Sequence, residues 1–175
     1  LRPYGTTIFA EMTALANRHG AVNLSQGFPD FDGPEFIKHA ATEAMARGQN
    51  QYGRMQGVPE LNAALVARWG RTTGQQIDGE TQVTVTAGCT EALAATFLGL
   101  LEPGDEVILF EPYYDCYHVG ITMAGGRVRA VSLRPGVRQR DGQSGGWAPE
   151  EFLFDPDELR RAFTPKTRLI VVNTP

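Results

Sequence analysis

Residues 83–101 read VTVTAGCTEALAATFLGLL, and this stretch decides the fold. Its two valines alternate with threonines, a β-prone pattern of period two that predicts a short strand over residues 83–86. From Thr90 onward, apolar side chains recur every three or four residues, which predicts a helix that stops before Pro103-Gly104. The stretch therefore predicts a strand, a tight turn and a helix in direct succession.

The turn of this stretch, Ala87-Gly88-Cys89, is a candidate anion site. The first N–H groups of a helix have no intrahelical partner, and the helix dipole adds about half a positive charge there. A phosphate would be held by the N–H groups of Cys89 and Thr90 and by the Thr90 hydroxyl, and Gly88 leaves room for it. The alternative is an ordinary connection without a ligand. The stretch matches neither the dinucleotide nor the P-loop fingerprint.

The composition is that of a globular protein and excludes several classes. The 175 residues are 42% hydrophobic and 21% charged, with a net charge of −4. Basic residues are scattered, so no nucleic-acid partner is expected, and no apolar run is long enough to span a membrane. The two cysteines, Cys89 and Cys116, have no metal-ligand spacing and form no disulfide framework. We therefore expect no metal site and a reducing, cytoplasmic setting.

Both ends of the sequence look truncated. The chain starts with Leu1 instead of methionine, and a buried-type strand over residues 168–172 is followed almost at once by Pro175. Such a strand needs covering elements on both faces. We therefore expect a fragment of a longer protein. Whether a leader precedes Leu1 is left open.

The remaining sequence alternates between helical and strand patterns. Apolar spacing, caps and prolines predict helices over residues 7–19, 34–47, 60–71 and 156–163. β-Prone runs predict strands over residues 106–110, 127–133 and 167–172. Glycine- and proline-rich stretches predict loops over residues 22–34, 49–59 and 134–151. This alternation predicts an α/β domain with a mostly parallel sheet.

Ligands of such sheets bind beyond the carboxyl ends of the strands. The turn after residues 83–86, the aromatic loop that follows strand 106–110 and the end of strand 168–172 should share that edge. Tyr113 or Tyr114 in the loop could stack on a flat heterocycle, although a core aromatic is the alternative for each. The convergence indicates an aromatic ligand that carries a phosphate.

Five motifs, in this order, resemble the amino-terminal part of the class I/II aminotransferases, pyridoxal-phosphate enzymes of fold type I. The motifs are SQGFPDF (25–31), NQY (50–52), VTAGCTEAL (85–93), EPGDEVILFEPYYDCY (102–117) and RLIVVNTP (168–175). They are most similar to the branch of the kynurenine, glutamine, methionine and actinobacterial succinyldiaminopimelate aminotransferases. The resemblance covers essentially the whole chain.

The resemblance implies a three-layer sandwich with a mostly parallel sheet, here incomplete and preceded by an N-terminal helical segment. Residues 1–33 would form the N-terminal helix and a loop that lines the substrate. Residues 34–175 would form the amino-terminal part of the large domain that binds pyridoxal 5'-phosphate, truncated at residue 175.

The resemblance also implies roles for residues that bind the cofactor. Gly88, Cys89 and Thr90 match the residues that hold the cofactor phosphate. Tyr114 matches the aromatic side chain that stacks on the pyridine ring. Tyr52 matches a tyrosine that reaches the phosphate from the neighbouring subunit, which implies a homodimer with shared active sites.

Three further residues match the substrate side of the site. Gly27 matches a backbone contact to the substrate carboxylate, and Phe9 matches an aromatic at the side-chain pocket. Asn173 matches the first asparagine of an NTPxNP segment. The Schiff-base lysine is expected beyond Pro175, as are an aspartate for the pyridine nitrogen and an arginine for the substrate. The lysines Lys38 and Lys166 do not match it, so no catalytic residue is assigned in this chain.

The implied function is transfer of an amino group from an amino acid to a 2-oxo acid through a pyridoxal phosphate Schiff base. It belongs to the full-length parent, and we expect the fragment alone to be inactive. The alternatives are a carbon–sulfur β-lyase on the same fold and a non-catalytic regulator with an aminotransferase-like domain. The sequence leaves the identity of both substrates open.

Overall fold

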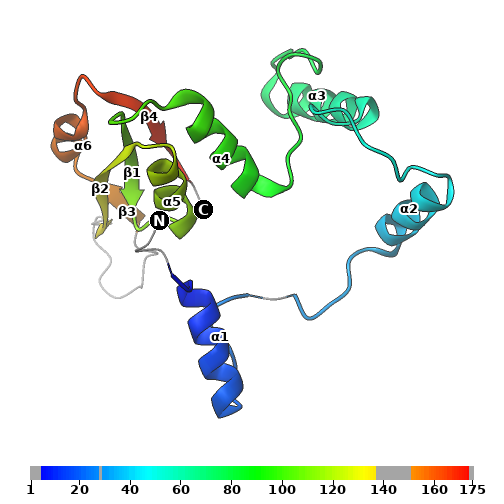
Figure 1. The fold of residues 1–175 in the computed structure, drawn as a ribbon, viewed down its shortest axis with the longest axis horizontal. Coiled ribbons are helices and arrows are strands. Elements are labelled where there is room, and N and C mark those ends of the chain that lie inside the picture. Colours follow the sequence, from blue (N-terminus) through cyan, green and yellow to red (C-terminus); the bar gives the residue numbers. More distant parts are fainter. Residues whose placement is uncertain (1–4, 28, 137–150, 174–175) are drawn as a thin grey trace, which may run out of the picture. The chain divides into compact units, whose positions relative to one another are not determined.

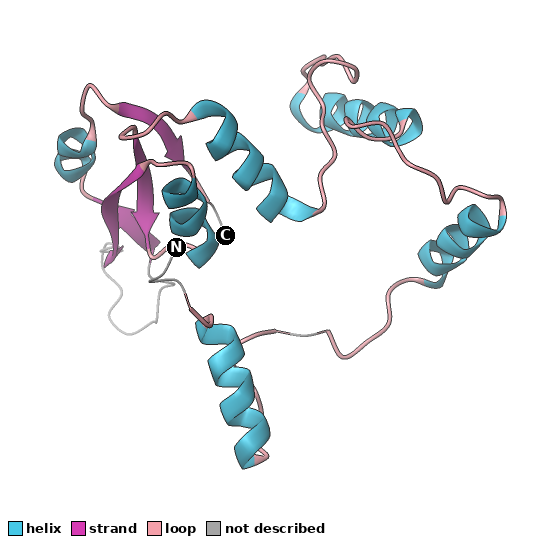
Figure 2. Ribbon diagram, in the orientation of Figure 1, coloured by secondary structure: helices cyan, strands magenta, loops and turns pink. Residues whose placement is uncertain are grey.

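The computed structural model describes residues 5–27, 29–136 and 151–173. Their contacts divide the chain into two compact units, one within residues 2–86 and the other within residues 87–175. Each unit is described by itself. Figures 1 and 2 show the helices and strands of both units.

The unit that starts at residue 87 is built on a sheet of four strands in the order β3-β2-β1-β4. Strand β1 pairs in parallel with β2 and with β4, whereas β3 runs antiparallel to β2. The strands are β1 (Glu106–Glu111), β2 (Arg127–Gly136), β3 (Glu151–Phe154) and β4 (Thr167–Val171). The expectation of a mostly parallel sheet is confirmed.

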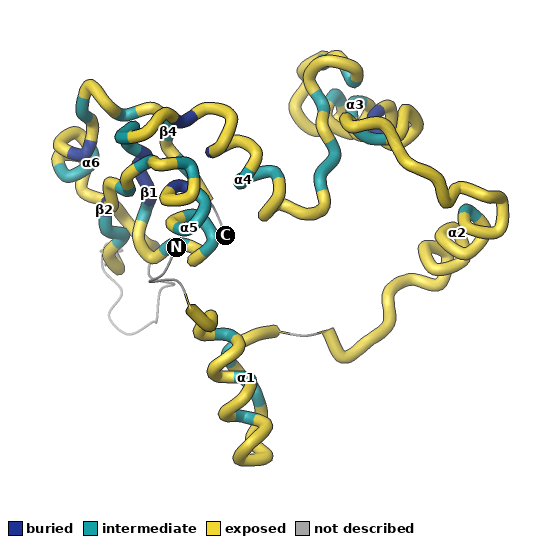
Figure 3. The backbone as a smooth tube through the Cα atoms, viewed as in Figure 1, coloured by how far each residue is buried: buried dark blue, intermediate teal, exposed yellow. Residues whose placement is uncertain are grey.

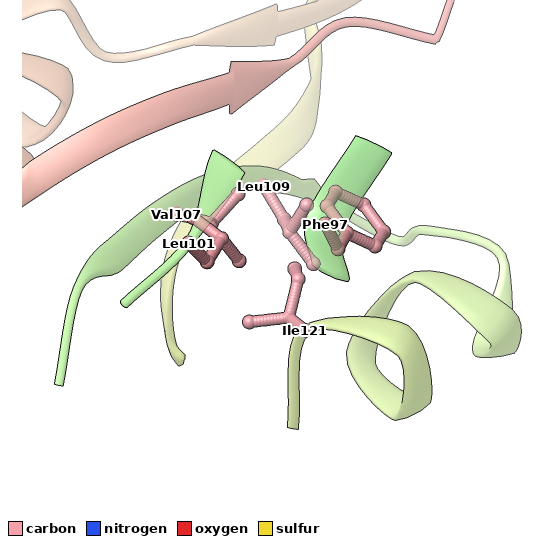
Figure 4. Packing of buried hydrophobic residues seen from close by; sticks show 5 residues of the cluster. All are labelled: Phe97, Leu101, Val107, Leu109 and Ile121. Carbon is pink, nitrogen blue, oxygen red and sulfur yellow. The ribbon is translucent and has the colours of Figure 1, made fainter. Parts of the chain in front are cut away.

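The central strand β1 is buried on both faces of this sheet. On one face, Val107 and Leu109 pack with Phe97, Leu101 and Ile121, as Figure 4 shows. These partners come from α4 (Gly88–Leu100), the residue after it, and α5 (Asp115–Met123). A continuous apolar run is typical of a parallel strand that is covered on both sides.

The other face of β1 is covered by α6 (Pro156–Ala162), because Ile108 packs with Val131 and Ala162. Helices α4 and α5, the sheet and α6 therefore form three layers. The dark-blue buried stretches in Figure 3 mark this core on β1 and on the elements that contact it.

Gly120 allows α4 and α5 to approach closely. A Cβ atom at this position would lie 2.8 Å from the Phe97 ring, closer than van der Waals contact allows. The absence of a side chain at Gly120 therefore lets α5 pack directly against α4 at Phe97.

Helix α6 has the capping signals that its sequence predicts. The Asp155 carboxylate accepts a hydrogen bond from the Asp157 N–H at 2.8 Å, and Pro156 occupies the first turn. Glu158 accepts hydrogen bonds from the Ser132 N–H at 3.0 Å and from Arg134 at 2.6 Å. These bonds lower the pKa of Glu158 and join α6 to β2.

The unit within residues 2–86 contains α1 (Ile8–His19), α2 (Glu35–Ala46) and α3 (Pro59–Thr73). Of the two candidate cap residues, Thr6 and Thr7, it is the Thr7 hydroxyl that caps α1 by accepting a hydrogen bond from the Ala10 N–H. Helices α1 and α2 have no buried residue, and the buried residue of α3 is the polar Asn62.

The prediction of a strand over residues 83–86 is wrong. The backbone there forms no ladder, and the Val85 N–H donates to the carbonyl of Gln56, a loop residue, at 3.0 Å. Alternation of valine and threonine indicates an extended backbone but does not supply a strand to pair with. Strands β1 to β4 all belong to the unit that starts at residue 87.

Two loops expected from the sequence are also shorter than predicted. The aromatic loop after β1 turns into α5 at Asp115, with Tyr114 as its N-cap residue. The loop expected over 134–151 begins and ends in paired strands, because Arg134 of β2 lies opposite Leu153 of β3. Residues 137–150 lie outside the described residues.

No helix among the described residues is both long and apolar enough to cross a lipid bilayer.

The core predicts different effects for two substitutions on α5. Ile121→Ala removes a fully buried side chain and should lower the free energy of unfolding by about 2–5 kcal/mol. Met123→Ala, at a half-exposed position, should change it by about 0.5 kcal/mol or less. Urea denaturation of both variants and the parent measures this difference. Similar losses for the two variants would contradict the assigned core.

Candidate cofactor site

The N-terminus of α4 is open toward solvent. Its N-cap residue, Ala87, makes no side-chain cap, and Gly88, Cys89 and Thr90 are exposed. Gly88 has a φ of +82°, which a residue with a side chain rarely adopts. The N–H groups of Cys89 and Thr90 have no intrahelical partner in this position. The end of the helix therefore presents donors and a positive dipole to an anion.

A carboxylate in the first turn of α4 occupies one of the neighbouring donors. The Glu91 side chain accepts a hydrogen bond from the N–H of Ala87. This contact satisfies a backbone donor at the edge of the turn and holds the Glu91 charge beside Ala87. This role of Glu91 was not predicted from the sequence, although an acidic residue in the first turn of a helix could have indicated it.

The N-terminus of α5 follows β1 through a cis peptide bond between Glu111 and Pro112. Tyr114, the N-cap residue, is 50% exposed. Its ring meets the ring of Tyr117 edge-on, with centroids 6.1 Å apart and planes at 68°. Tyr114 is therefore half exposed at the N-terminus of α5.

Thr90, in the first turn of α4, lies near Cys116, in the first turn of α5. Burial raises the pKa of Cys116, and the nearby Asp115 and Cys89 add to this effect, whereas the Thr90 side chain lowers it. Burial also raises the pKa of Tyr117. Cys116 was not predicted as part of the site, because the sequence did not indicate that α5 begins there.

The carboxyl end of β4 leads to the same edge of the sheet. Asn173 follows this strand and lines a small cavity together with Tyr113 and Tyr117. Because β1 and β4 are parallel neighbours, their carboxyl ends lie at one edge. The structure thus gathers Cys89, Thr90, Tyr114 and Asn173 within one unit.

The other candidate residues, Phe9, Gly27 and Tyr52, belong to the unit within residues 2–86. Phe9 lies on α1 and is partly buried, and Gly27 lies in an exposed loop. The Tyr52 side chain is fully exposed. Their assignment to a site shared with α4 stays a prediction.

The two lysines of the chain have other environments. Lys38 forms ion pairs with Glu35 and Asp32, and the hydrogen bonds to these carboxylates raise its pKa. Lys166 precedes the amino end of β4, whereas Asn173 follows its carboxyl end. Within the unit that contains α4, Lys166 therefore lies away from the edge that carries Asn173.

The two thiols should differ in their rates of alkylation. Iodoacetamide should modify Cys89 first, because Cys89 is exposed whereas Cys116 is partly buried and has a raised pKa. Mass spectrometry of peptides from a timed reaction measures both rates, and Cys89→Ser should remove the fast phase. Faster or equal modification of Cys116 would contradict this arrangement.

Comparison with known proteins shows the same architecture elsewhere. Residues 19–175 match the family model described as aminotransferase class I and II. The structure of N-succinyldiaminopimelate aminotransferase from Mycobacterium tuberculosis superposes with a TM-score of 0.88 at 50% identity, over 100% of this chain and 42% of that one. Aspartate aminotransferase from Thermus thermophilus gives a TM-score of 0.80 at 36% identity, over 99% of this chain and 43% of that one.

Curated relatives agree with these structures. The methionine aminotransferase of Escherichia coli is 43% identical over 98% of this chain and 41% of its own length. Human kynurenine–oxoglutarate transaminase 1 is 42% identical over 95% of this chain and 39% of its own length. The chain spans about two fifths of the length of these relatives, and it belongs to the class I and II aminotransferase family.

Proposed function

We propose that the full-length protein containing this chain is a pyridoxal-phosphate-dependent aminotransferase. It transfers an amino group from an amino acid to a 2-oxo acid, and this chain supplies its amino-terminal part. The observation that carries the proposal is the exposed N-terminus of α4 beside a half-exposed tyrosine, in a chain whose relatives are named aminotransferases.

The residues at α4 suit the phosphate of this cofactor. The N–H groups of Cys89 and Thr90 and the Thr90 hydroxyl would bind the phosphate oxygens. A Cβ atom at Gly88 would meet nothing within 4 Å, so there is space in front of the turn. Glu91 is held at the Ala87 N–H, which leaves the donors of Cys89 and Thr90 to the phosphate.

Tyr114 would orient the cofactor ring by stacking against it, and its half-exposed face suits this role. When bound, pyridoxal phosphate supplies the electron sink that stabilises negative charge at the α-carbon of the amino acid. The lysine that moves the α-proton is assigned to sequence beyond Pro175. The role of this chain is therefore to bind and orient.

Phe9, Gly27 and Asn173 are proposed for the substrate side of the site. Asn173 lies at the carboxyl end of β4, on the same edge as Tyr113 and Tyr117. The relatives are named for different amino acids, including methionine, kynurenine and aspartate. The amino donor is therefore left unassigned. Tyr52 is proposed to reach the phosphate of a second subunit, in a homodimer with shared sites.

The proposed function is tested with the full-length protein, pyridoxal phosphate, a panel of amino acids and 2-oxoglutarate. We expect one 2-oxo acid to form for each glutamate produced, at turnover far above that of free cofactor. Pyruvate release from cystathionine without glutamate formation would instead identify a β-lyase. Cofactor binding without turnover of either kind would identify a regulator.

Thr90→Ala should weaken binding of pyridoxal phosphate by about 1–3 kcal/mol, because it removes a hydrogen bond to a charged group. Thr96→Ala is the matched control on α4, since its hydroxyl bonds only to the carbonyl of Ala92 in its own helix. Equilibrium dialysis measures the affinity of each variant. Equal affinity of Thr90→Ala and Thr96→Ala would contradict the assigned phosphate site.

A further inference from the structure

The loop of residues 52–58 is irregular, yet its backbone is held by hydrogen bonds from both sides. The Gly57 N–H donates to the carbonyl of Arg54 at 3.0 Å, which closes a tight turn. In return, Nε of Arg54 donates to the carbonyl of Gly57 at 3.2 Å. The Arg54 side chain thus closes the turn that its own backbone begins.

The rest of the Arg54 guanidinium group binds Glu80, a residue far along the sequence. The two Glu80 carboxylate oxygens accept bonds of 2.6 Å and 3.3 Å, a bidentate pair. This bonding raises the pKa of Arg54. Glu80 is itself placed by Asp78, whose carboxylate accepts from the N–H of Glu80 at 2.9 Å and the hydroxyl of Thr81 at 2.8 Å.

Asn62 joins the same two segments from the inside. Its side chain is buried, with 1% of the residue exposed, at the start of α3. Its amide nitrogen donates to the carbonyl of Gln56 at 3.2 Å and to that of Gly79 at 3.1 Å. The Val85 N–H donates to the same Gln56 carbonyl at 3.0 Å. The Gln56 carbonyl thus joins Asn62 of α3 to Val85, and the Asn62 amide adds the turn at residue 79.

There is no spare room at the centre of this arrangement. A Cβ atom at Gly57 would lie 2.6 Å from Oδ1 of Asn62 and 2.7 Å from the Val85 side chain. The φ of Gly57 is +110°, in the region that favours glycine. The loop can therefore adopt only a narrow range of positions relative to Asn62 and Val85.

Tyr52 lies at the start of this loop and differs from the residues that follow it in having an exposed side chain. Its side chain is fully exposed, although the residues that follow it are fixed by a buried amide and a bidentate ion pair. Fixing a loop costs conformational entropy, and the buried Asn62 amide adds a further cost because its Oδ1 accepts no hydrogen bond from the described residues. Packing of the Tyr52 ring within this unit does not offset that cost.

We propose that Arg54, Glu80 and Asn62 are positioning residues, which hold Tyr52 where its hydroxyl can bond to the cofactor phosphate. The inference rests on the proposed function and adds to it the residues that set the Tyr52 geometry. Val85, on the same network, precedes Gly88 of the phosphate turn by three residues in the sequence. Within the unit of residues 2–86, the network therefore fixes both the Tyr52 loop and the segment at Val85.

The test measures the affinity of the full-length protein for pyridoxal phosphate and for pyridoxal, which lacks the phosphate. Glu80→Gln should weaken pyridoxal phosphate binding by about tenfold, as loss of a hydrogen bond to a charged group would. It should leave pyridoxal binding unchanged. Tyr52→Phe should have the same selective effect, and the double variant should bind no more weakly than Tyr52→Phe alone.

Glu43→Gln is the matched control, because it breaks the exposed Arg47–Glu43 pair on α2 and should leave both affinities within about twofold. Arg54→Lys, which keeps the charge but loses the bidentate geometry, should fall between the parent and Glu80→Gln. It also provides a second variant if Glu80→Gln does not fold. Circular dichroism and melting temperature report folding.

The inference would be overturned by equal loss of affinity for pyridoxal and pyridoxal phosphate in the folded variants. Additive losses of affinity with Tyr52→Phe, or no loss in either Glu80→Gln or Arg54→Lys, would also overturn it. Unchanged binding in Tyr52→Phe would also overturn it, while a loss in Thr90→Ala would leave the proposed function intact. If neither Thr90→Ala nor Tyr52→Phe affected binding, the proposed function itself would fail.

Discussion

The burial of strand β1 on both faces is the constraint on which the rest of its unit depends. Val107, Ile108 and Leu109 are fully buried, so helices must cover the sheet on each side. On one side these helices are α4 and α5, and the small Gly120 lets them pack closely. Because both helices are fixed against one strand, their N-termini meet at the edge where β1 ends, and Thr90 lies near Cys116.

The proposed phosphate site needs no metal-ligand cluster and no basic patch in the residues involved. The donors are backbone N–H groups, which the helix supplies at its end regardless of side chain. The side chain of Glu91 adjusts the surroundings by accepting the hydrogen bond of the Ala87 N–H.

Much of this architecture can be predicted from local sequence signals. Thr7, Asp155 and Pro156 mark helix starts because capping depends on a few adjacent residues, and the apolar run of β1 marks a strand buried on both faces. The error at residues 83–86 has a physical cause, since extended conformation is local whereas a ladder needs a partner strand. Helix α5 was missed because its sequence, DCYHVGITM, combines β-branched residues with a glycine that is needed for packing against Phe97.

In the candidate site, too, features set by adjacent residues were predictable, whereas contacts between distant residues were not. The start of α4 near Cys89 and Thr90 was predictable from the apolar periodicity that follows it, and the roles of these residues and of Tyr114 at a cofactor stay predictions. The contact of Thr90 with Cys116 and the network of Arg54, Glu80 and Asn62 depend on residues far apart in sequence. No local pattern reports such pairs.

The most direct measurement is a crystal structure of the full-length protein with pyridoxal phosphate. Our account predicts phosphate oxygens within about 3 Å of the backbone nitrogens of Cys89 and Thr90, and the Tyr114 ring against the pyridine ring. A phosphate bound elsewhere, with these donors facing only water, would contradict it.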